Sequence, residues 1–132
     1  MAAENLSRIL HVDDETDIRE VAKLALEAVG GFTVESCGSG QEAVSRAAGF
    51  APDLILLDVM MPGLDGPATF RALKELPECA NTPVIFVTAK AMPPELNRFK
   101  EMGAIGVIAK PFDPMTLADQ LRSIWMEKHD RT

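Results

Sequence analysis

Short apolar runs and longer amphipathic stretches alternate five times along the chain. Each apolar run is about five residues long, is rich in aliphatic side chains and is bounded by polar or turn-forming residues. This pattern is typical of strands that are buried on both faces of a sheet. The runs predict strands at residues 8–12, 32–36, 53–57, 83–87 and 105–109.

The stretch that follows each run carries apolar residues at helical spacing. The first predicted helix covers residues 14–29, ends at Gly30-Gly31 and has an apolar stripe made of Ile18, Val21, Ala22, Ala25 and Val29. The later helices are predicted to begin at the capping box 39–42, at Gly66-Pro67, at Pro93-Pro94 and at the cap Asp113-Pro114.

Strict alternation of strand and helix predicts an α/β fold with a parallel sheet and right-handed crossovers. Five such units in 132 residues fit the flavodoxin-like (βα)5 architecture, a doubly wound five-stranded sheet with strand order 2-1-3-4-5. An eight-fold barrel needs roughly twice this length. We therefore expect a single domain over residues 1–132, with its core at about 7–126 and a polar tail at 127–132.

Composition and charge narrow the choice of partners and location. The chain has 47% hydrophobic and 25% charged residues, as globular proteins do. Its net charge of −7 argues against direct contact with nucleic acid or an anionic membrane surface, because both need a basic face. Cys37 and Cys79 match no metal or redox spacing and are expected to be reduced. With no secretory signal and no run long enough to span a bilayer, the sequence predicts a cytoplasmic location.

Polar side chains of three kinds follow four of the five predicted strands. Asp13-Asp14 follow the first strand, Asp58 the third, Thr88 the fourth and Lys110 the fifth. In open α/β sheets the ligand site lies beyond the carboxyl ends of the strands, near the switch in strand order. We therefore expect these side chains to converge on one edge of the sheet.

The chemistry of these residue types points to phosphoryl transfer. Three carboxylates gathered at one edge repel one another, and Mg²⁺ both relieves that repulsion and neutralises the charge of a phosphoryl group. Lys110 supplies a positive charge for one phosphoryl oxygen, and the Thr88 hydroxyl can donate to another. Asp58, held rigidly at the end of a buried strand, is the candidate nucleophile for an aspartyl phosphate.

Four segments, HVDDE, LLDVMMPGLDG, PVIFVTAK and AKPF, stand in a familiar order and at familiar spacings. On these motifs, over about residues 7–126, the chain resembles the receiver domain of bacterial two-component response regulators, the class that includes the single-domain, CheY-like chemotaxis regulators. The resemblance implies a signalling phosphoacceptor that catalyses only its own phosphorylation and dephosphorylation, and not an enzyme with an external substrate.

The resemblance also implies a donor and a cation. Asp58 would take its phosphoryl group from the phosphohistidine of a sensor histidine kinase or a histidine phosphotransfer protein. Asp14, Asp58 and the backbone carbonyl of Met60 would bind Mg²⁺, or Mn²⁺ in its place. Asp13 would bind the cation largely through water.

The phosphoryl group would, by the same resemblance, lie against Thr88, Ala89, Lys110 and the backbone of Met60. The Lys110-Pro111 bond would be cis. Phosphorylation would move the loop after the fourth strand and remodel the surface of the fourth helix, fifth strand and fifth helix, where Thr88, Val107 and Pro111 lie. That surface would bind a downstream protein effector, and the chain would be a monomer or a phosphorylation-dependent dimer.

One position departs from the family pattern. Family members commonly place Tyr or Phe three residues before the lysine, as a rotameric switch, and this chain has Val107 there. An ordinary strand valine explains that residue, so we expect Thr88 to signal by another route.

Three alternatives remain at this point. A phosphohydrolase of the haloacid dehalogenase type would need an Asp-x-Asp nucleophile after the first strand, and a flavodoxin would need a phosphate loop where two aspartates stand. A receiver-like binding module that is never phosphorylated has all the same residues. A domain excised from a larger regulator would also look almost the same as a stand-alone protein.

Overall fold

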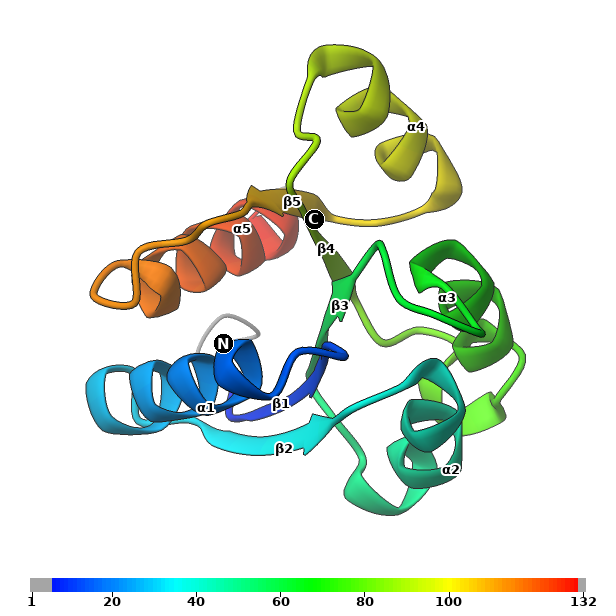
Figure 1. Cartoon of the computed structure of the whole chain (residues 1–132), viewed down its shortest axis with the longest axis horizontal. Helices are drawn as coiled ribbons and strands as arrows, with labels where there is room; N and C mark the ends of the chain where they lie inside the picture. Colours follow the sequence, from blue (N-terminus) through cyan, green and yellow to red (C-terminus); the bar gives the residue numbers. More distant parts are fainter. Residues whose placement is uncertain (1–5, 131–132) are drawn as a thin grey trace.

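The structure is a computed structural model that describes residues 6–130, with side-chain surroundings for residues 6–128. Five strands form one parallel sheet in the order β2-β1-β3-β4-β5, as the alternation of strands and helices predicted (Figure 1). The strands are β1 (Arg8–Val12), β2 (Thr33–Cys37), β3 (Leu54–Asp58), β4 (Val84–Thr88) and β5 (Gly106–Ala109).

Helices cover both faces of the sheet (Figure 1). One face carries α1 (Thr16–Leu24) with its π-helical continuation η2 (Ala25–Val29), and α5 (Leu117–Asp130). The other face carries α2 (Gly40–Phe50), α3 (Gly66–Lys74) and α4 (Pro93–Met102), and a 3-10 turn η3 (Pro77–Cys79) precedes β4. No helix within residues 6–130 is long and apolar enough to cross a membrane.

Two hydrophobic clusters fill the space between the sheet and its helices. Leu10, Leu57, Phe70, Phe86 and Phe99 belong to the cluster under α2, α3 and α4. Ile9, Leu26, Leu56, Leu121 and Trp125 belong to the cluster under α1 and α5. Every residue of β3 and β4 is buried, because both faces of the sheet are covered.

The first helix differs from the prediction. It begins at Thr16, not at residue 14, and after Leu24 it widens into the π-helical turn η2. Val21 and Val29, placed in the buried stripe from their spacing, are 41% and 51% exposed, whereas Leu26 is fully buried. A π-helical turn holds more residues than an α-helical one, so it rotates Val29 away from the 3.6-residue pattern. Val21 precedes this turn, and its exposure shows that the buried stripe of α1 is narrower than predicted.

The last helix also differs. Asp113 does not cap it: its carboxylate accepts from the Met115 N–H at 2.9 Å and so stabilises a turn, and α5 begins at Leu117. The helix continues to Asp130, so most of the predicted polar tail is helical, while residues 131–132 lie outside the described part. Leu117, Leu121 and Trp125 pack this helix against the sheet and are buried.

The register of the sheet aligns the strand ends that matter for function. Val12 pairs with Leu57, and Thr88 pairs with Ala109, so the residues just beyond these positions leave the sheet at one edge. The turn after β3 is tight: a Cβ on Gly66 would lie 2.5 Å from the carbonyl oxygen of Asp58. Only glycine admits this approach, and the Gly66 N–H donates to the Val59 carbonyl at 2.8 Å.

Candidate functional site

Three aspartates meet at the carboxyl edge of the sheet. Asp13 and Asp14 follow β1, and Asp58 ends β3. One carboxylate oxygen of each lies within 4.8 Å of the others. Asp13 is fully buried and Asp58 is 3% exposed, whereas Asp14 is exposed. The structure thus brings together the three acidic residues that the sequence singled out.

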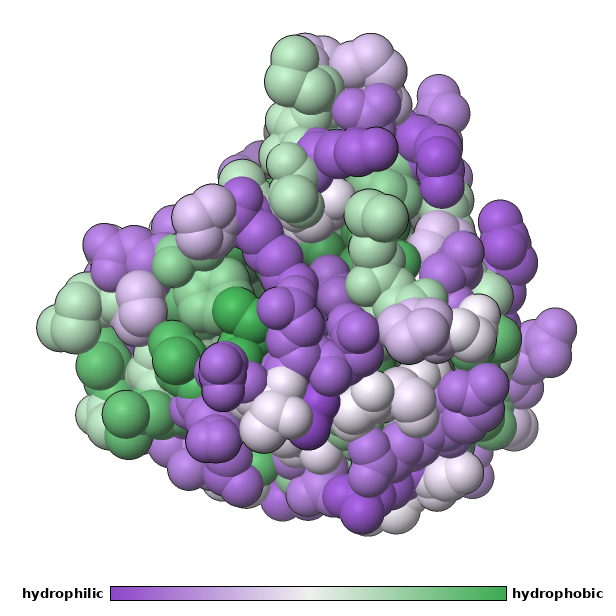
Figure 2. Space-filling view, in the orientation of Figure 1, coloured by the Kyte–Doolittle hydropathy of each residue, from purple (hydrophilic) through white to green (hydrophobic). Residues whose placement is uncertain are grey.

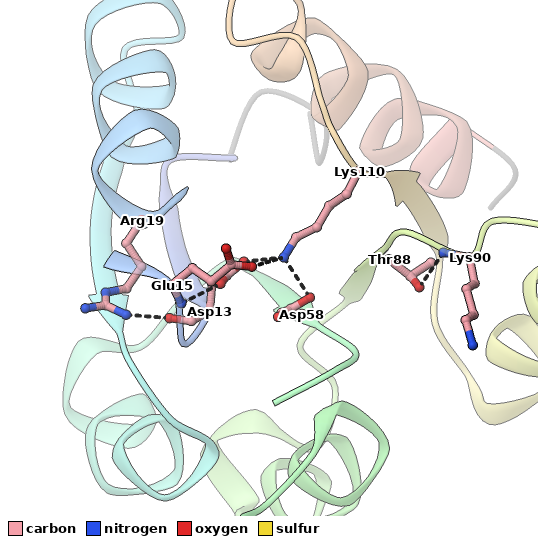
Figure 3. A network of polar contacts seen from close by, with 7 residues as sticks. All are labelled: Asp13, Glu15, Arg19, Asp58, Thr88, Lys90 and Lys110. Atoms are coloured by element: carbon pink, nitrogen blue, oxygen red, sulfur yellow. Dashed lines mark hydrogen bonds and ion pairs between the residues drawn. The ribbon is translucent and has the colours of Figure 1, made fainter. Parts of the chain in front are cut away.

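Lys110 reaches this cluster from the end of β5 (Figure 3). Its Nζ lies 2.9 Å from Asp13 Oδ2 and 3.1 Å from Asp58 Oδ1. Glu15, whose side chain is largely exposed, is a more distant partner at 3.7 Å. One ammonium group therefore stands among several carboxylates, and the pocket keeps an excess of negative charge.

This environment changes the protonation of both partners. Burial raises the pKa of Asp58 to about 6, Asp13 and to a smaller extent Asp14 add to the rise, and Lys110 opposes it. Partial burial disfavours the charged form of Lys110, but Asp13 and Asp58 outweigh that effect and hold its pKa above the usual value. A positive ligand would therefore stabilise the ionised form of Asp58.

Asp13 is fixed by its neighbours on several sides. Its N–H donates to the Cys37 carbonyl at 3.0 Å, and its Oδ1 accepts from the Glu15 N–H at 2.9 Å. Its carbonyl oxygen accepts from Nη1 of Arg19 at 2.7 Å (Figure 3). Sequence reasoning did not identify Arg19, because no motif marks a side chain whose target is a backbone group.

Thr88 lies at the same edge but is turned away from the aspartates. It is 3% exposed, and its Oγ1 accepts from the backbone N–H of Lys90 at 3.0 Å. Figure 3 shows its hydroxyl directed towards that loop and not towards Asp58. Ala89, which stands between Thr88 and Lys90 in the sequence, is exposed. The structure therefore does not join the hydroxyl of Thr88 to the acidic cluster.

The other predicted site residues lie around this edge. Met60, two residues after Asp58, has a 67% exposed side chain. The Lys110-Pro111 bond is cis, as the resemblance implied, and Pro111 is exposed. Val107 in β5 is half-buried and lines a surface cavity of about 370 Å³ between β5 and α5.

The acidic cluster fits a divalent cation. Its donor set consists of carboxylate oxygens, the hard ligands that Mg²⁺ and Mn²⁺ prefer. The ammonium group of Lys110 lies between Asp13 and Asp58, which shows that these two carboxylates can share a cation. A cation with a higher charge would neutralise the cluster more completely.

Comparison with known proteins places the chain in a family. The sequence model of the response regulator receiver domain matches residues 9–122, which is most of the chain. The chain therefore belongs to the response regulator receiver domain family, whose members are signalling phosphoacceptors. The resemblance found on the four motifs is thereby confirmed.

Curated relatives include longer regulators. ResD of Bacillus subtilis, a transcriptional regulatory protein, is 36% identical over 126 residues, which are 94% of this chain and 50% of ResD. The phosphate regulon transcriptional regulatory protein PhoB of Pseudomonas aeruginosa is 39% identical over 116 residues, which are 88% of this chain and 50% of PhoB. The chain thus spans about half the length of these curated relatives.

Solved structures give the same fold over almost the whole chain. The chemotaxis response regulator CheY4 of Vibrio cholerae superposes with a TM-score of 0.83 at 31% identity, covering 91% of this chain and 99% of CheY4. The signal receiver domain of a histidine kinase from Syntrophus aciditrophicus gives a TM-score of 0.77 at 36% identity, covering 96% of this chain and 94% of that domain.

Proposed function

We propose that this receiver domain takes a phosphoryl group onto Asp58 from a phosphohistidine and thereby changes the surface that it offers to a protein effector. The donor would be a sensor histidine kinase or a histidine phosphotransfer protein. One observation carries the proposal: Asp58 is a buried carboxylate with a raised pKa, set between two other aspartates and a lysine. A carboxylate in such a pocket is suited to nucleophilic attack on phosphorus.

The proposed transfer uses groups that the chain itself supplies. A carboxylate oxygen of Asp58 forms a bond to phosphorus while the phosphorus–nitrogen bond breaks, and the electron pair of that bond stays on the imidazole nitrogen. Lys110, already 3.1 Å from Asp58 Oδ1, then pairs with a phosphoryl oxygen. The Ala89 and Met60 backbone groups at the same edge are the expected further contacts.

Mg²⁺, or Mn²⁺ in its place, would be held by Asp13, Asp14, Asp58 and the backbone carbonyl of Met60. When bound, such a cation neutralises the carboxylates and the phosphoryl oxygens and so lowers the barrier to transfer. The short distances among the three carboxylates support this assignment.

Signalling would begin at Thr88. Its hydroxyl now accepts from the Lys90 N–H, and a phosphoryl oxygen on Asp58 offers that hydroxyl a new acceptor. We expect the loop from Thr88 to Met92 to shift on activation even though Val107 replaces the usual aromatic residue. Unchanged amide chemical shifts in that loop after phosphorylation would contradict this route.

We expect the donor to dock on the apolar surface beside the pocket. Figure 2 shows apolar residues gathered over α1 and α5, beside the hydrophilic band at the centre of the view. This surface includes a cavity of about 280 Å³ lined by Asp17, Ile18, Val21, Ala89, Lys110, Pro111 and Phe112. Since Lys110 also contacts Asp58, a protein docked there lies next to the phosphoacceptor.

Intact mass after incubation with Mg²⁺ and a small phosphodonor tests the proposal, with Asp58→Asn as the control. We expect one added phosphoryl group, which is absent in the variant and absent without Mg²⁺. No adduct in the wild type, together with no binding of beryllofluoride, would contradict the proposal and favour a receiver-like module that is never phosphorylated.

A further inference from the structure

The Arg19 side chain contacts the backbone of the acidic site, at the carbonyl oxygen of Asp13. We propose that Arg19 is a positioning residue for the cation site: its guanidinium fixes the backbone that carries Asp13 and Asp14 and thereby sets the affinity of the pocket for a divalent cation. The inference deepens the proposed function and rests on it. Arg19 itself would touch neither the cation nor the phosphoryl group.

Two hydrogen bonds from one guanidinium define this role. Nη1 of Arg19 donates to the Asp13 carbonyl at 2.7 Å, and Nη2 donates to Thr16 Oγ1 at 3.2 Å. Thr16 is the first residue of α1, so the guanidinium ties the end of β1 to the start of the helix. The loop between them, which carries Asp14, is therefore held at both ends by the same guanidinium group.

The remaining contacts of Asp13 explain why this bond matters most when a cation enters. Its Oδ2 pairs with Lys110 in this structure, and a divalent cation in the cluster would compete for that oxygen. The carbonyl bond to Arg19 lies on the other side of the residue and does not depend on Lys110. Asp14 makes no hydrogen bond or ion pair within the described residues, so the backbone on either side is what limits where its exposed carboxylate can lie.

The chain leaves room for this guanidinium at Gly38. A Cβ at that position would lie 3.1 Å from Nη1 of Arg19, which is tighter than ordinary contact. The loop that carries Gly38 is itself held in place, because the Gly38 N–H donates to Glu42 Oε1 at 2.5 Å. The position of Arg19 is thus determined by α1 on one side and by the loop between β2 and α2 on the other.

Positioning and charge predict opposite effects of Arg19 on cation binding. A positive charge near an acidic pocket repels a cation, so if charge alone mattered, removing Arg19 would tighten Mg²⁺ binding. If the guanidinium holds the carboxylates in place, removing it weakens Mg²⁺ binding, as loss of an outer partner of a metal ligand generally does. The sign of the change therefore separates the two roles.

The test measures the Mg²⁺ dissociation constant of Arg19→Lys and Arg19→Gln from the amide chemical shifts of residues 13–15. Arg122→Lys and Arg122→Gln are matched controls, because Arg122 also donates to a backbone carbonyl, that of Gly30, at the far end of η2. We expect Arg19→Gln to weaken Mg²⁺ binding about tenfold and Arg19→Lys to weaken it less. We expect the Arg122 variants to bind Mg²⁺ like the wild type.

Phosphorylation kinetics and Gly38→Ala give independent readouts. For Arg19→Gln the Mg²⁺ concentration at half-maximal rate should rise by the same factor as the dissociation constant, whereas the rate at saturating Mg²⁺ should stay within about twofold. Gly38→Ala, which leaves the charge unchanged, should weaken Mg²⁺ binding by a smaller factor. Unfolding in urea without Mg²⁺ separates these effects from a general loss of stability.

Four outcomes would overturn the inference. Tighter Mg²⁺ binding by Arg19→Gln would show that Arg19 acts through its charge alone. Unchanged binding, or an equal loss in the Arg122 variants, would show that Arg19 is only a structural residue. A wild type that binds no Mg²⁺ would overturn the proposed cation site, and this inference with it. If the wild type binds Mg²⁺ but the Arg19 variants do not bind it more weakly, only this inference fails and the proposed function stands.

Discussion

Charged side chains lie at both the amino edge of the sheet, where the strands begin, and the carboxyl edge, where they end. The pairing of these charges differs between the two edges. At the amino edge, Arg8 donates to the Phe50 carbonyl at 2.9 and 2.7 Å and stacks on the Phe50 ring, 4.2 Å from its centroid. Asp53 Oδ2 accepts from the backbone N–H groups of Ser7 and Arg8 at 3.0 and 2.8 Å. Each of these charges has partners that satisfy it within the chain.

At the carboxyl edge the charges are not balanced. Asp13, Asp14 and Asp58 gather there with Lys110 as the close cation, and burial raises the pKa of Asp58. Charged groups that are paired with backbone donors stabilise the fold, whereas a buried cluster of one sign lowers its stability until a ligand of the other sign binds. Unbalanced charge at the carboxyl edge therefore marks the candidate functional site.

Asp53→Ala should cause the largest loss of stability. Two backbone N–H groups lose a charged acceptor, so we expect the free energy of unfolding to fall by about 2 kcal/mol. Urea unfolding measures this loss. Phosphorylation of Asp58 should continue at the wild-type extent, and a variant that stays folded but is not phosphorylated would show that the two edges are not independent.

Asp58→Asn should have the opposite effect on stability at neutral pH. The folded-state pKa of Asp58, about 6, is above its ordinary value of 3.8, so its ionised form lowers the stability of the fold at every pH above that value. A pKa unit corresponds to about 1.4 kcal/mol, and since Lys110 also loses a partner we expect a gain of about 1–2 kcal/mol at pH 7 without Mg²⁺. The gain should shrink as the pH falls from about 6 to 3.8 and be absent below that range.

Urea unfolding of both proteins across this pH range measures the effect of Asp58→Asn. Asp119→Asn, an exposed change of equal charge on α5, is the control and should alter the free energy of unfolding by less than about 0.5 kcal/mol. A loss of stability in Asp58→Asn at pH 7 would mean that the ionised Asp58 has partners as favourable as those of Asp53. The charges at the two edges would then not differ as described.

Lys110→Met should tighten the binding of Mg²⁺. The ammonium group occupies Asp13 Oδ2 and Asp58 Oδ1, so its removal leaves the carboxylates without a competitor for the cation. We expect an affinity about threefold to tenfold higher, equivalent to about 1 kcal/mol. Calorimetric titration measures it, with Lys100→Met, an exposed change on α4, as the control. Weaker binding in Lys110→Met would show that Lys110 orders the pocket and does not compete for it.

Val107→Ala should have the smallest effect. Val107 is half-buried in β5, away from both charged edges, so we expect a loss of about 1 kcal/mol or less in urea unfolding and no change in Mg²⁺ affinity. A loss above about 2 kcal/mol would make Val107 a core residue. A change in Mg²⁺ affinity would show that Val107 influences the carboxyl edge even though its side chain is not aromatic.

The sequence predicted the sheet order and the edge that carries the site because both depend on strong local signals. The apolar runs of β3 and β4 are bounded by polar or turn-forming residues. Asp13 and Lys110 follow their strands directly, and Asp58 ends its strand. Once the strands are parallel, their carboxyl ends meet at one edge, whatever the exact limits of the helices.

The details that failed depend on geometry that the sequence does not encode locally. Val29 is exposed because η2 widens the helix, and no residue type marks such a turn. Asp113 looks the same in sequence whether it caps a helix or stabilises a turn before one. The orientation of Thr88 and the contact between Arg19 and the Asp13 carbonyl involve backbone groups, so residue spacing carried no signal for them.

A Mg²⁺ titration followed through the amide spectrum of the wild type compares the two edges most directly. We expect saturable shifts at residues 13–15 and 58–60 at millimolar Mg²⁺, with little change at residues 7–8 and 53. No saturable shift at the carboxyl edge, or equal shifts at both edges, would contradict the claim that the unbalanced carboxylates form a specific cation site.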